Sequence, residues 1–396
     1  MATRSPSNEP TNLAVSLRGA LFHRTDYEKL VNVLAECERT TDSWMIDSED
    51  QLVLSRKALT SGGDRISWLA MRQICKALSA GLASSLADLL GMRRSADAMD
   101  KPSKVKADPD EDFTVGEAAS LYNLVLKKRF GRLFGFQAIR NSETKVIEAL
   151  VGNRYRRLSN SDFLSAVSSV MGSCNVSLSF FSAELSGRRV SLVYSMDGYD
   201  EAGLTPGIRI VNSEIGDSAI KAAVVLIDSK GATMQSAYGR MGRVAHSGRD
   251  LLGKLSQLIV GVVAKLENKT FSKESLAKKE SDAQSRLLGF TGEETDEARF
   301  RSLVEFLTDR GGLTYFMSRR CLSMVLTGDE TASNNFLMLD RSKNWPSKSA
   351  MDLVRSITME SLEQRSLNFS NTDKYERIAW NLFFNRLVLP DSVSGE

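Results

Sequence analysis

The sequence has little of what metal sites and catalytic sites are made from. Its 396 residues include two histidines and four cysteines, and no cysteines form a CxxC pair. Structural zinc sites use closely spaced thiolates, so we predict reduced, buried cysteines and neither a bound metal nor a cofactor. The motifs GxxxxGK[ST], GxGxxG, GxSxG and HExxH are also absent. These absences favour a protein that is not an enzyme.

Long apolar runs are missing as well. The apolar stretch 258–264 is much shorter than the roughly 20 residues of a membrane-spanning helix. The N-terminus lacks the charged and apolar regions of a signal peptide. We therefore expect no membrane partner and a soluble protein of the cytoplasm.

Hydrophobic residues make up 42% of the chain and charged residues 26%, which is typical of a globular protein with a real core. The hydrophobic periodicity predicts an α+β fold, with a helical N-terminal region, a central antiparallel sheet with packed helices, and a helical C-terminal extension. The expected divisions are a disordered tail (1–12), a helical region (13–94), a flexible linker (95–112), an α+β core (113–265) and a helical C-terminal region (266–396).

Period-two alternation predicts the strands of the core. Valine, leucine and aromatic residues recur at every second position on both sides of a turn at 186–189, which is typical of an antiparallel hairpin. Further strands are expected at 51–54, 136–140, 145–151, 208–212 and 222–227. Helices are expected at 249–268, 294–307, 315–326 and 352–365, with an interrupted polar helix before 288.

The formal net charge is only +3, but the cations are unevenly spread. Residues 127–157 hold nine lysines and arginines against Glu143 and Glu148, a local excess of seven. Such a stretch is the expected footprint of a phosphate backbone. A solvated helix face is the alternative interpretation. The nine cations are Lys127, Lys128, Arg129, Arg132, Arg140, Lys145, Arg154, Arg156 and Arg157.

Within this stretch, arginines flank Tyr155, a pattern suited to phosphate contact combined with base stacking. Tyr155 is equally compatible with a place in the core. Farther along, Arg240, Arg243, His246 and Arg249 recur every three residues, which would place them on one face of a helix or turn. A solvated face is again the alternative.

Two segments carry a family resemblance. Residues 151–160 (VGNRYRRLSN) and 207–216 (GIRIVNSEIG) resemble elements of the DUF932-like family of phage and plasmid proteins. The hairpin between them and the basic segment 240–248 follow in the family's order, and the resemblance covers about residues 65–265. A family element with Cys and Asn is replaced here by 231–235 (GATMQ), which leaves any role of that element in doubt.

The resemblance implies a role in DNA transactions of mobile elements, without a defined activity. Within 207–216, the residues Asn212, Ser213, Glu214 and Gly216 are the most specific match, and their role in the family is unknown. Asn212, Ser213 and Gly216 also suit a strand exit, because they hydrogen-bond their own backbone or reach positive φ. The segment is therefore open to a structural interpretation and to a functional one.

We expect a non-enzymatic DNA-binding protein of a phage or plasmid in a bacterial host cell. It would act in recombination, single-strand annealing or replication, favour single-stranded DNA and form a homo-oligomer. The alternatives are a phage structural or assembly protein, and a metal-dependent DNA-processing enzyme using Glu184, Asp197, Asp200 and Glu214. The candidate binding residues are Lys127, Lys128, Arg129, Arg154, Tyr155, Arg156, Arg157, Arg240 and Arg243.

Overall fold

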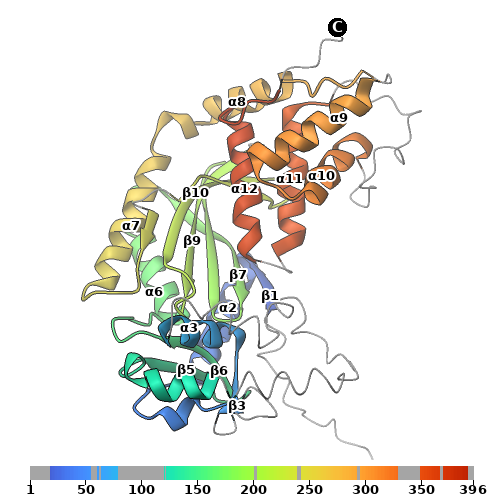
Figure 1. Ribbon diagram of the computed structural model, residues 1–396. Coiled ribbons are helices and arrows are strands. Elements are labelled where there is room, and N and C mark those ends of the chain that lie inside the picture. Colours follow the sequence, from blue (N-terminus) through green and yellow to red (C-terminus); the bar gives the residue numbers. More distant parts are fainter. Residues whose placement is uncertain are drawn as a thin grey trace, which may run out of the picture.

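The protein folds into two lobes, each built around its own sheet (Figure 1). The computed structural model describes residues 18–54, 60–61, 64–78, 120, 122–199, 203–238, 242–291, 295–328, 348–365 and 369–390. Both helices and mostly antiparallel strands are present among the described residues, and this confirms the predicted α+β class. The tail expected at 1–12 and the linker expected at 95–112 lie outside the described residues.

The large lobe is centred on a seven-stranded sheet in the order β1–β7–β8–β9–β10–β11, with β12 also paired to β10. Every neighbouring pair in it is antiparallel. The strands are β1 (Arg18–His23), β7 (Leu178–Ser186), β8 (Arg189–Met196), β9 (Leu204–Ser213), β10 (Ile220–Asp228), β11 (Thr233–Gln235) and β12 (Arg243–Val244).

Alternation along the strands separates the two faces of this sheet. Ile208 and Ile210 on β9 and Val224 on β10 join the large apolar core on one face. Three helices cover that face: α2 (Tyr27–Arg39), α6 (Asn160–Met171) and α7 (Leu251–Leu266).

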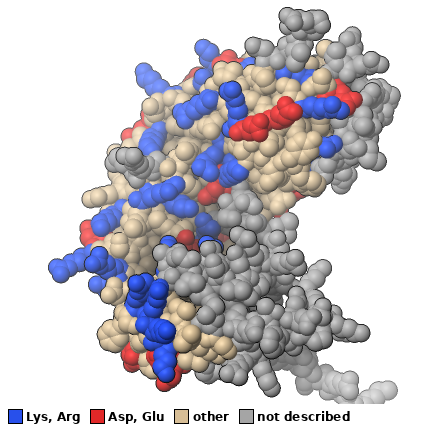
Figure 2. Space-filling view, in the orientation of Figure 1, with Lys and Arg blue, Asp and Glu red and all other residues tan. Residues whose placement is uncertain are grey.

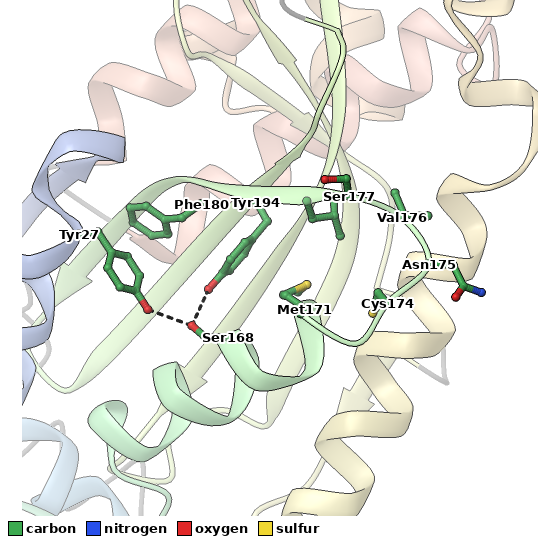
Figure 3. A pocket seen from close by; sticks show the side chains of 11 residues that line it. Tyr27, Ser168, Met171, Cys174, Asn175, Val176, Ser177, Phe180 and Tyr194 are labelled. Atoms are coloured by element: carbon green, nitrogen blue, oxygen red, sulfur yellow. Dashed lines mark hydrogen bonds between the residues drawn. The ribbon is translucent and has the colours of Figure 1, made fainter.

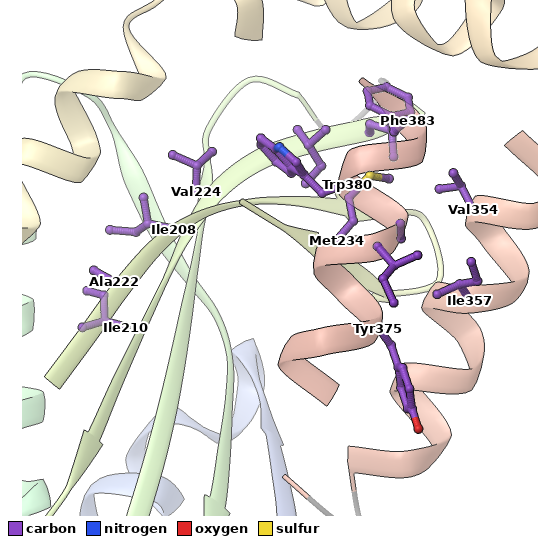
Figure 4. Packing of buried hydrophobic residues seen from close by; sticks show 14 of the residues in the cluster. Ile208, Ile210, Ala222, Val224, Met234, Val354, Ile357, Tyr375, Trp380 and Phe383 are labelled. Carbon is purple, nitrogen blue, oxygen red and sulfur yellow. The ribbon is translucent and has the colours of Figure 1, made fainter. Parts of the chain in front are cut away.

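The C-terminal helices pack at the β11 end of the same sheet. They are α8 (Lys273–Ser285), α9 (Thr295–Phe306), α10 (Tyr315–Thr327), α11 (Ala350–Arg365) and α12 (Phe369–Phe383). Figure 4 shows Met234 of β11 beside Trp380 of α12, while Ile208 and Ala222 point away from α11 and α12. The described residues also form the single turns η1 (Arg24–Asp26), η2 (Glu49–Leu52), η4 (Phe130–Arg132) and η6 (Lys269–Phe271) and the π-helical η7 (Leu307–Gly311).

A buried ion pair fixes α12 to the sheet. Arg209 of β9 and Glu376 of α12 are 3% and 0% exposed and form a direct salt bridge. The guanidinium also donates to Thr233 Oγ1 at 2.6 Å, and Thr233 Oγ1 in turn donates to Glu376 Oε1 at 2.9 Å. Because an unpaired buried charge is very costly, this geometry holds the C-terminal helices in one position.

The small lobe has a five-stranded sheet in the order β2–β5–β6–β4–β3, in which only the β4–β6 pair is parallel. Its apolar core lies under α3 (Trp68–Leu78) and the helical residues 122–129, with Met71, Ile74 and Tyr122 fully buried. The strands are β2 (Thr41–Met45), β3 (Thr60–Ser61), β4 (Asp64–Ile66), β5 (Gln137–Asn141) and β6 (Val146–Val151).

Three expectations need correction. The N-terminal region is not uniformly helical, because β1 joins the large sheet and β2, β3 and β4 join the small one. Residues 51–54 do not form a strand. Gln51 ends up in the turn η2, where its side chain accepts a hydrogen bond from the Ser48 backbone at 3.1 Å. The expected core over 113–265 is divided between the lobes, since β5 and β6 pair with N-terminal strands.

Candidate nucleic-acid interface and the junction behind it

The Asn212–Gly216 segment forms the exit of strand β9, as the sequence predicted. β9 ends at Ser213, and Gly216 follows in the left-handed region with φ at 68°. A Cβ on Gly216 would lie 2.9 Å from Val151 Cγ1 and 3.2 Å from the Tyr155 ring. Only glycine fits both the backbone conformation and the space at this position.

Tyr155 packs against this turn and forms hydrogen bonds with it. Its hydroxyl donates to Ser213 O at 2.9 Å and accepts from Gly216 N at 3.1 Å. Its ring stacks on His246 with centroids 5.0 Å apart, and it belongs to a small apolar cluster with Val151. Both ends of the side chain are therefore engaged within the protein, and the structure favours the core interpretation of Tyr155.

His246 is buried, so the expected single face of Arg240, Arg243, His246 and Arg249 does not form. Its Nδ1 donates to Arg156 O at 3.2 Å, while Nε2 is buried without a hydrogen-bond partner among the described residues. Burial lowers the pKa of His246, because a second ring proton would have no acceptor there. Arg243 and Arg249 are exposed, and Arg240 lies outside the described residues.

Two buried asparagines connect the 151–160 and 207–216 segments. Asn212 Nδ2 donates to Leu158 O at 3.1 Å and to Asn160 Oδ1 at 2.8 Å. Asn160 Nδ2 donates to Arg188 O at 3.2 Å. The two stretches that carry the resemblance, more than 50 residues apart in sequence, are therefore in direct contact.

Glu214 is the charged centre of this contact. Its side chain is 2% exposed, accepts a hydrogen bond from Asn160 N at the start of α6, and pairs with Arg157 at 3.2 Å. Burial raises the pKa of Glu214, whereas Arg157, Asn160 N and Arg188 act to lower it. A carboxylate at a helix N-terminus satisfies otherwise unpaired backbone N–H groups. Glu214 and Arg157 thus stabilise the fold locally.

Arg188 extends this cluster across the lobes. It is 5% exposed, donates to Glu148 Oε2 of β6 at 2.7 Å and to Cys37 O of α2 at 2.6 Å, and lies 4.0 Å from Glu214 Oε2. Nearby, Gln73 of α3 donates to Ile215 O at 3.1 Å. We call Asn160, Arg157, Arg188, Asn212 and Glu214 the junction cluster, because it joins the lobes.

Most of the candidate cations are exposed on the surface of the protein. Lys127, Lys128 and Arg129 are exposed at the end of the helical residues 122–129. Arg129 and Arg132 both donate to the carbonyl of Leu78, the last described residue of α3, at 3.2 Å each. This shared acceptor brings two guanidinium groups together and helps neutralise the carbonyl end of the helix.

Two further contacts bring the segments that carry the other cations near one another. Gly135, just after η4, faces Asn153, whose Cβ would be 3.8 Å from an added Cβ. The residue before Arg154 thus contacts the turn at Gly135, and the Arg156 backbone donates to His246 O at 2.8 Å, in the segment that contains Arg243 and Arg249. We define the basic surface by eight exposed cations: Lys127, Lys128, Arg129, Arg132, Arg154, Arg156, Arg243 and Arg249.

No member of the basic surface forms an ion pair within the described part of the chain. By contrast, Arg157 pairs with Glu214 and is only 20% exposed in its side chain, so it belongs to the junction cluster. Figure 2 shows Lys and Arg side chains gathered at the lower left, over the small lobe and the lower end of α7.

Sequence reasoning missed the exposed aromatic residue of this surface. Phe134 is 67% exposed, two residues after Arg132, while its neighbour Leu133 is fully buried. The stretch 130–136 (FGRLFGF) contains three phenylalanines, and spacing alone does not tell which of them faces solvent. Gly135, with φ at 80°, reverses the chain there and leaves Phe134 outside.

The acids named for a metal-dependent enzyme do not converge. Glu214 lies at the β7–β8 turn end of the sheet, where its N–H donates to Arg188 O. Asp197 lies at the opposite end of β8 and accepts from Ser177 Oγ at 2.5 Å. Glu184 is buried on β7, and Asp200 lies outside the described residues. Across the described residues, no cluster of three His, Cys, Asp or Glu side chains suits a metal.

No family model, curated protein or solved structure matches this chain. In the part of the chain that the structure describes, no helix has the length and apolarity needed to cross a bilayer.

Proposed function

We propose that the protein binds nucleic acid, with single-stranded DNA favoured, through the basic surface. The proposal rests on a difference between exposed and buried cations in whether they pair with a carboxylate of the protein. Eight exposed cations on three adjoining segments lack ion pairs among the described residues, whereas the buried Arg188 and Arg209 have carboxylate partners. Unneutralised cations on neighbouring loops suit a phosphate backbone, because binding releases the counterions condensed on it.

Phe134 supports the preference for single strands. An exposed phenylalanine beside arginines offers a flat surface on which an unpaired base can stack, and every base has such a face. In a duplex the bases are already stacked on each other and do not reach a surface side chain. Phe134 thus takes the role that the sequence had suggested for Tyr155.

The wider role rests on the resemblance of residues 151–160 and 207–216 to the DUF932-like family. It favours a non-enzymatic protein of phage or plasmid recombination, annealing or replication in the cytoplasm of a bacterial host. A homo-oligomer suits that role, since a strand longer than one basic surface would bridge several copies.

The test is a titration of fluorescent single-stranded and duplex oligonucleotides, followed by anisotropy across a series of salt concentrations. Affinity should fall by about 0.7 log units per decade of salt for each phosphate contacted on a single strand. The double variant Arg154→Gln/Arg156→Gln should lower both the affinity and this slope. Phe134→Ala should weaken single-strand binding by about 1–3 kcal/mol and leave the slope nearly unchanged.

Arg301→Gln is the matched control, because Arg301 is an exposed arginine that already pairs with Glu297. It should bind like the parent. If folded parent protein binds neither strand form at low salt, the proposal is wrong, and the exposed Phe134 then favours an assembly surface. Degradation of the oligonucleotide in the presence of magnesium would instead support a DNA-processing enzyme.

A further inference from the structure

A pocket of about 550 Å³ opens at the end of α6, well away from the basic surface. It lies between the start of α2, the last turn of α6 and strands β7 and β8 (Figure 3). Its size falls within the range of roughly 300–1,000 Å³ that small-molecule sites occupy.

One wall of the pocket is aromatic. The Phe180 ring meets Tyr27 edge-on with centroids 5.0 Å apart, and it meets Tyr194 at 81° with centroids 5.9 Å apart. Three rings held at steep angles to one another form a rigid apolar corner against which a flat ring can pack. Met171 adds a flexible apolar side chain that adapts to the ligand's outline.

The same wall carries a chain of hydroxyl groups. Tyr27 and Ser168 share a hydrogen bond of 2.9 Å, and Ser168 and Tyr194 share one of 3.4 Å. Burial raises the pKa of Tyr194 to about 12, so its hydroxyl keeps its proton at neutral pH. Each hydroxyl both donates and accepts, so the chain can reorient to serve a ligand edge that presents both kinds of group.

No charged side chain is found among the described residues that line the pocket. A phosphate or carboxylate group would therefore gain no ion pair from the lining on entering it, and would lose its hydration. The lining instead combines rings, hydroxyl groups, the Cys174 thiol and the uncharged Asn175, whose amide points away from the rings in Figure 3.

We propose that this pocket binds a neutral, planar heterocycle with hydrogen-bond donors and acceptors on its edge, of the nucleobase class. The base can belong to a free nucleoside or to an unpaired position in a strand. The aromatic corner takes the ring face, and the Tyr27–Ser168–Tyr194 hydroxyls take its edge. The site goes beyond the proposed function, since none of its residues belongs to the basic surface.

Cys174 offers a direct reporter, because it lines the pocket and is only half-buried. The probes are adenosine and uridine, and the readout is the rate of Cys174 alkylation by iodoacetamide at mildly alkaline pH, measured by peptide mass spectrometry. Either nucleoside should slow Cys174 severalfold at saturation and leave Cys37, which does not line the pocket, unchanged. Calorimetry should give the affinity for the same nucleosides.

Tyr194→Phe and Ser168→Ala each remove one hydroxyl and keep most of the shape. Each should weaken nucleoside binding by about fivefold to tenfold, the usual effect of one lost hydrogen bond. Tyr315→Phe, which alters an exposed tyrosine on α10, is the matched control and should bind like the parent. The inference is overturned if neither nucleoside protects Cys174 in the folded parent, or if both hydroxyl variants are protected as well as the parent.

A final experiment distinguishes a base of a bound strand from the base of a free nucleoside. Protection of Cys174 by an oligonucleotide that Arg154→Gln/Arg156→Gln abolishes would assign the pocket to a base of the bound strand. Protection by adenosine that the double variant leaves unchanged would assign it to a free nucleoside. Since adenosine carries no phosphate, loss of strand binding alone would remove the proposed function and leave this site standing.

Discussion

Arg209 and Arg154 carry the same guanidinium group in opposite surroundings. Arg209 is 3% exposed on a central strand and donates to Glu376, Thr233 and Gln235. Arg154 is exposed on the turn after β6, and it forms no ion pair within the described residues. The first is held by the fold and stabilises it, while the second is available to a partner.

The difference extends to neighbours in sequence. Arg156 and Arg157 are adjacent, yet Arg156 belongs to the basic surface and Arg157 pairs with the buried Glu214. Substituting interior cations should therefore change stability, and substituting surface cations should change binding alone. Three further variants test how much contacts in the interior contribute to stability.

The largest effect is expected for Glu376→Gln, which keeps the shape of the side chain and leaves Arg209 charged without a counter-charge. Removing one partner of a buried pair costs about 3–5 kcal/mol, and urea unfolding would measure it. Glu297→Gln, at the exposed pair with Arg301, should cost about 1 kcal/mol or less. Equal losses in the two variants would show that burial does not distinguish the pairs.

A smaller loss is expected for Gly216→Val at the junction of the lobes. The positive φ and the 2.9 Å approach to Val151 together should cost about 2–4 kcal/mol in the free energy of unfolding. Gly187→Val is the matched control, because Gly187 has φ at 57° but nothing within 4 Å of its Cβ position. The amount by which Gly216→Val lowers the free energy of unfolding more than Gly187→Val measures the effect of the contact with Val151 and Tyr155. A parent-like melting curve for Gly216→Val would contradict the packing described here.

The smallest effect concerns pH. The folded pKa of His246 lies below its ordinary value, so the unfolded chain binds more protons in the window just below pH 6.5. The stability that His246 contributes is present above this window and is lost as pH falls through it. Melting temperatures of the parent should thus drop more between pH 7.5 and 5.5 than those of His246→Gln. The variant His23→Gln, at an exposed histidine, should follow the parent.

Much of the fold was predictable because its signals are local. The alternation around 186–189 gave the β7–β8 hairpin, and the helix predicted at 315–326 matches α10 within one residue. The α12 helix went unpredicted although Tyr375, Ile378, Ala379 and Leu382 follow a helical spacing, and all four are buried.

The site was less predictable because its contacts are long-range. The sequence placed a glycine turn at Gly216, but it did not show that Tyr155 fills that turn from 61 positions away. The same holds for Glu214, whose partners Arg157 and Asn160 come from another segment. Phe134 is exposed because the core of the small lobe does not bury it, although two other phenylalanines lie nearby in sequence. Which of the three is buried depends on packing in three dimensions and not on residue type.

The pairing of β1 with β7 has a consequence for the order in which the molecule is made. Phe22 is opposite Ala183, and the whole small lobe is encoded between them. A chain leaving the ribosome at roughly 5–20 residues per second would hold β1 without its partner for on the order of 10 to 30 seconds. During that interval the small lobe can complete its own sheet, while β1 remains an open edge that needs protection from other chains. Of the described strands β1 is made first, yet it can pair only after β5 and β6 of the small lobe have emerged.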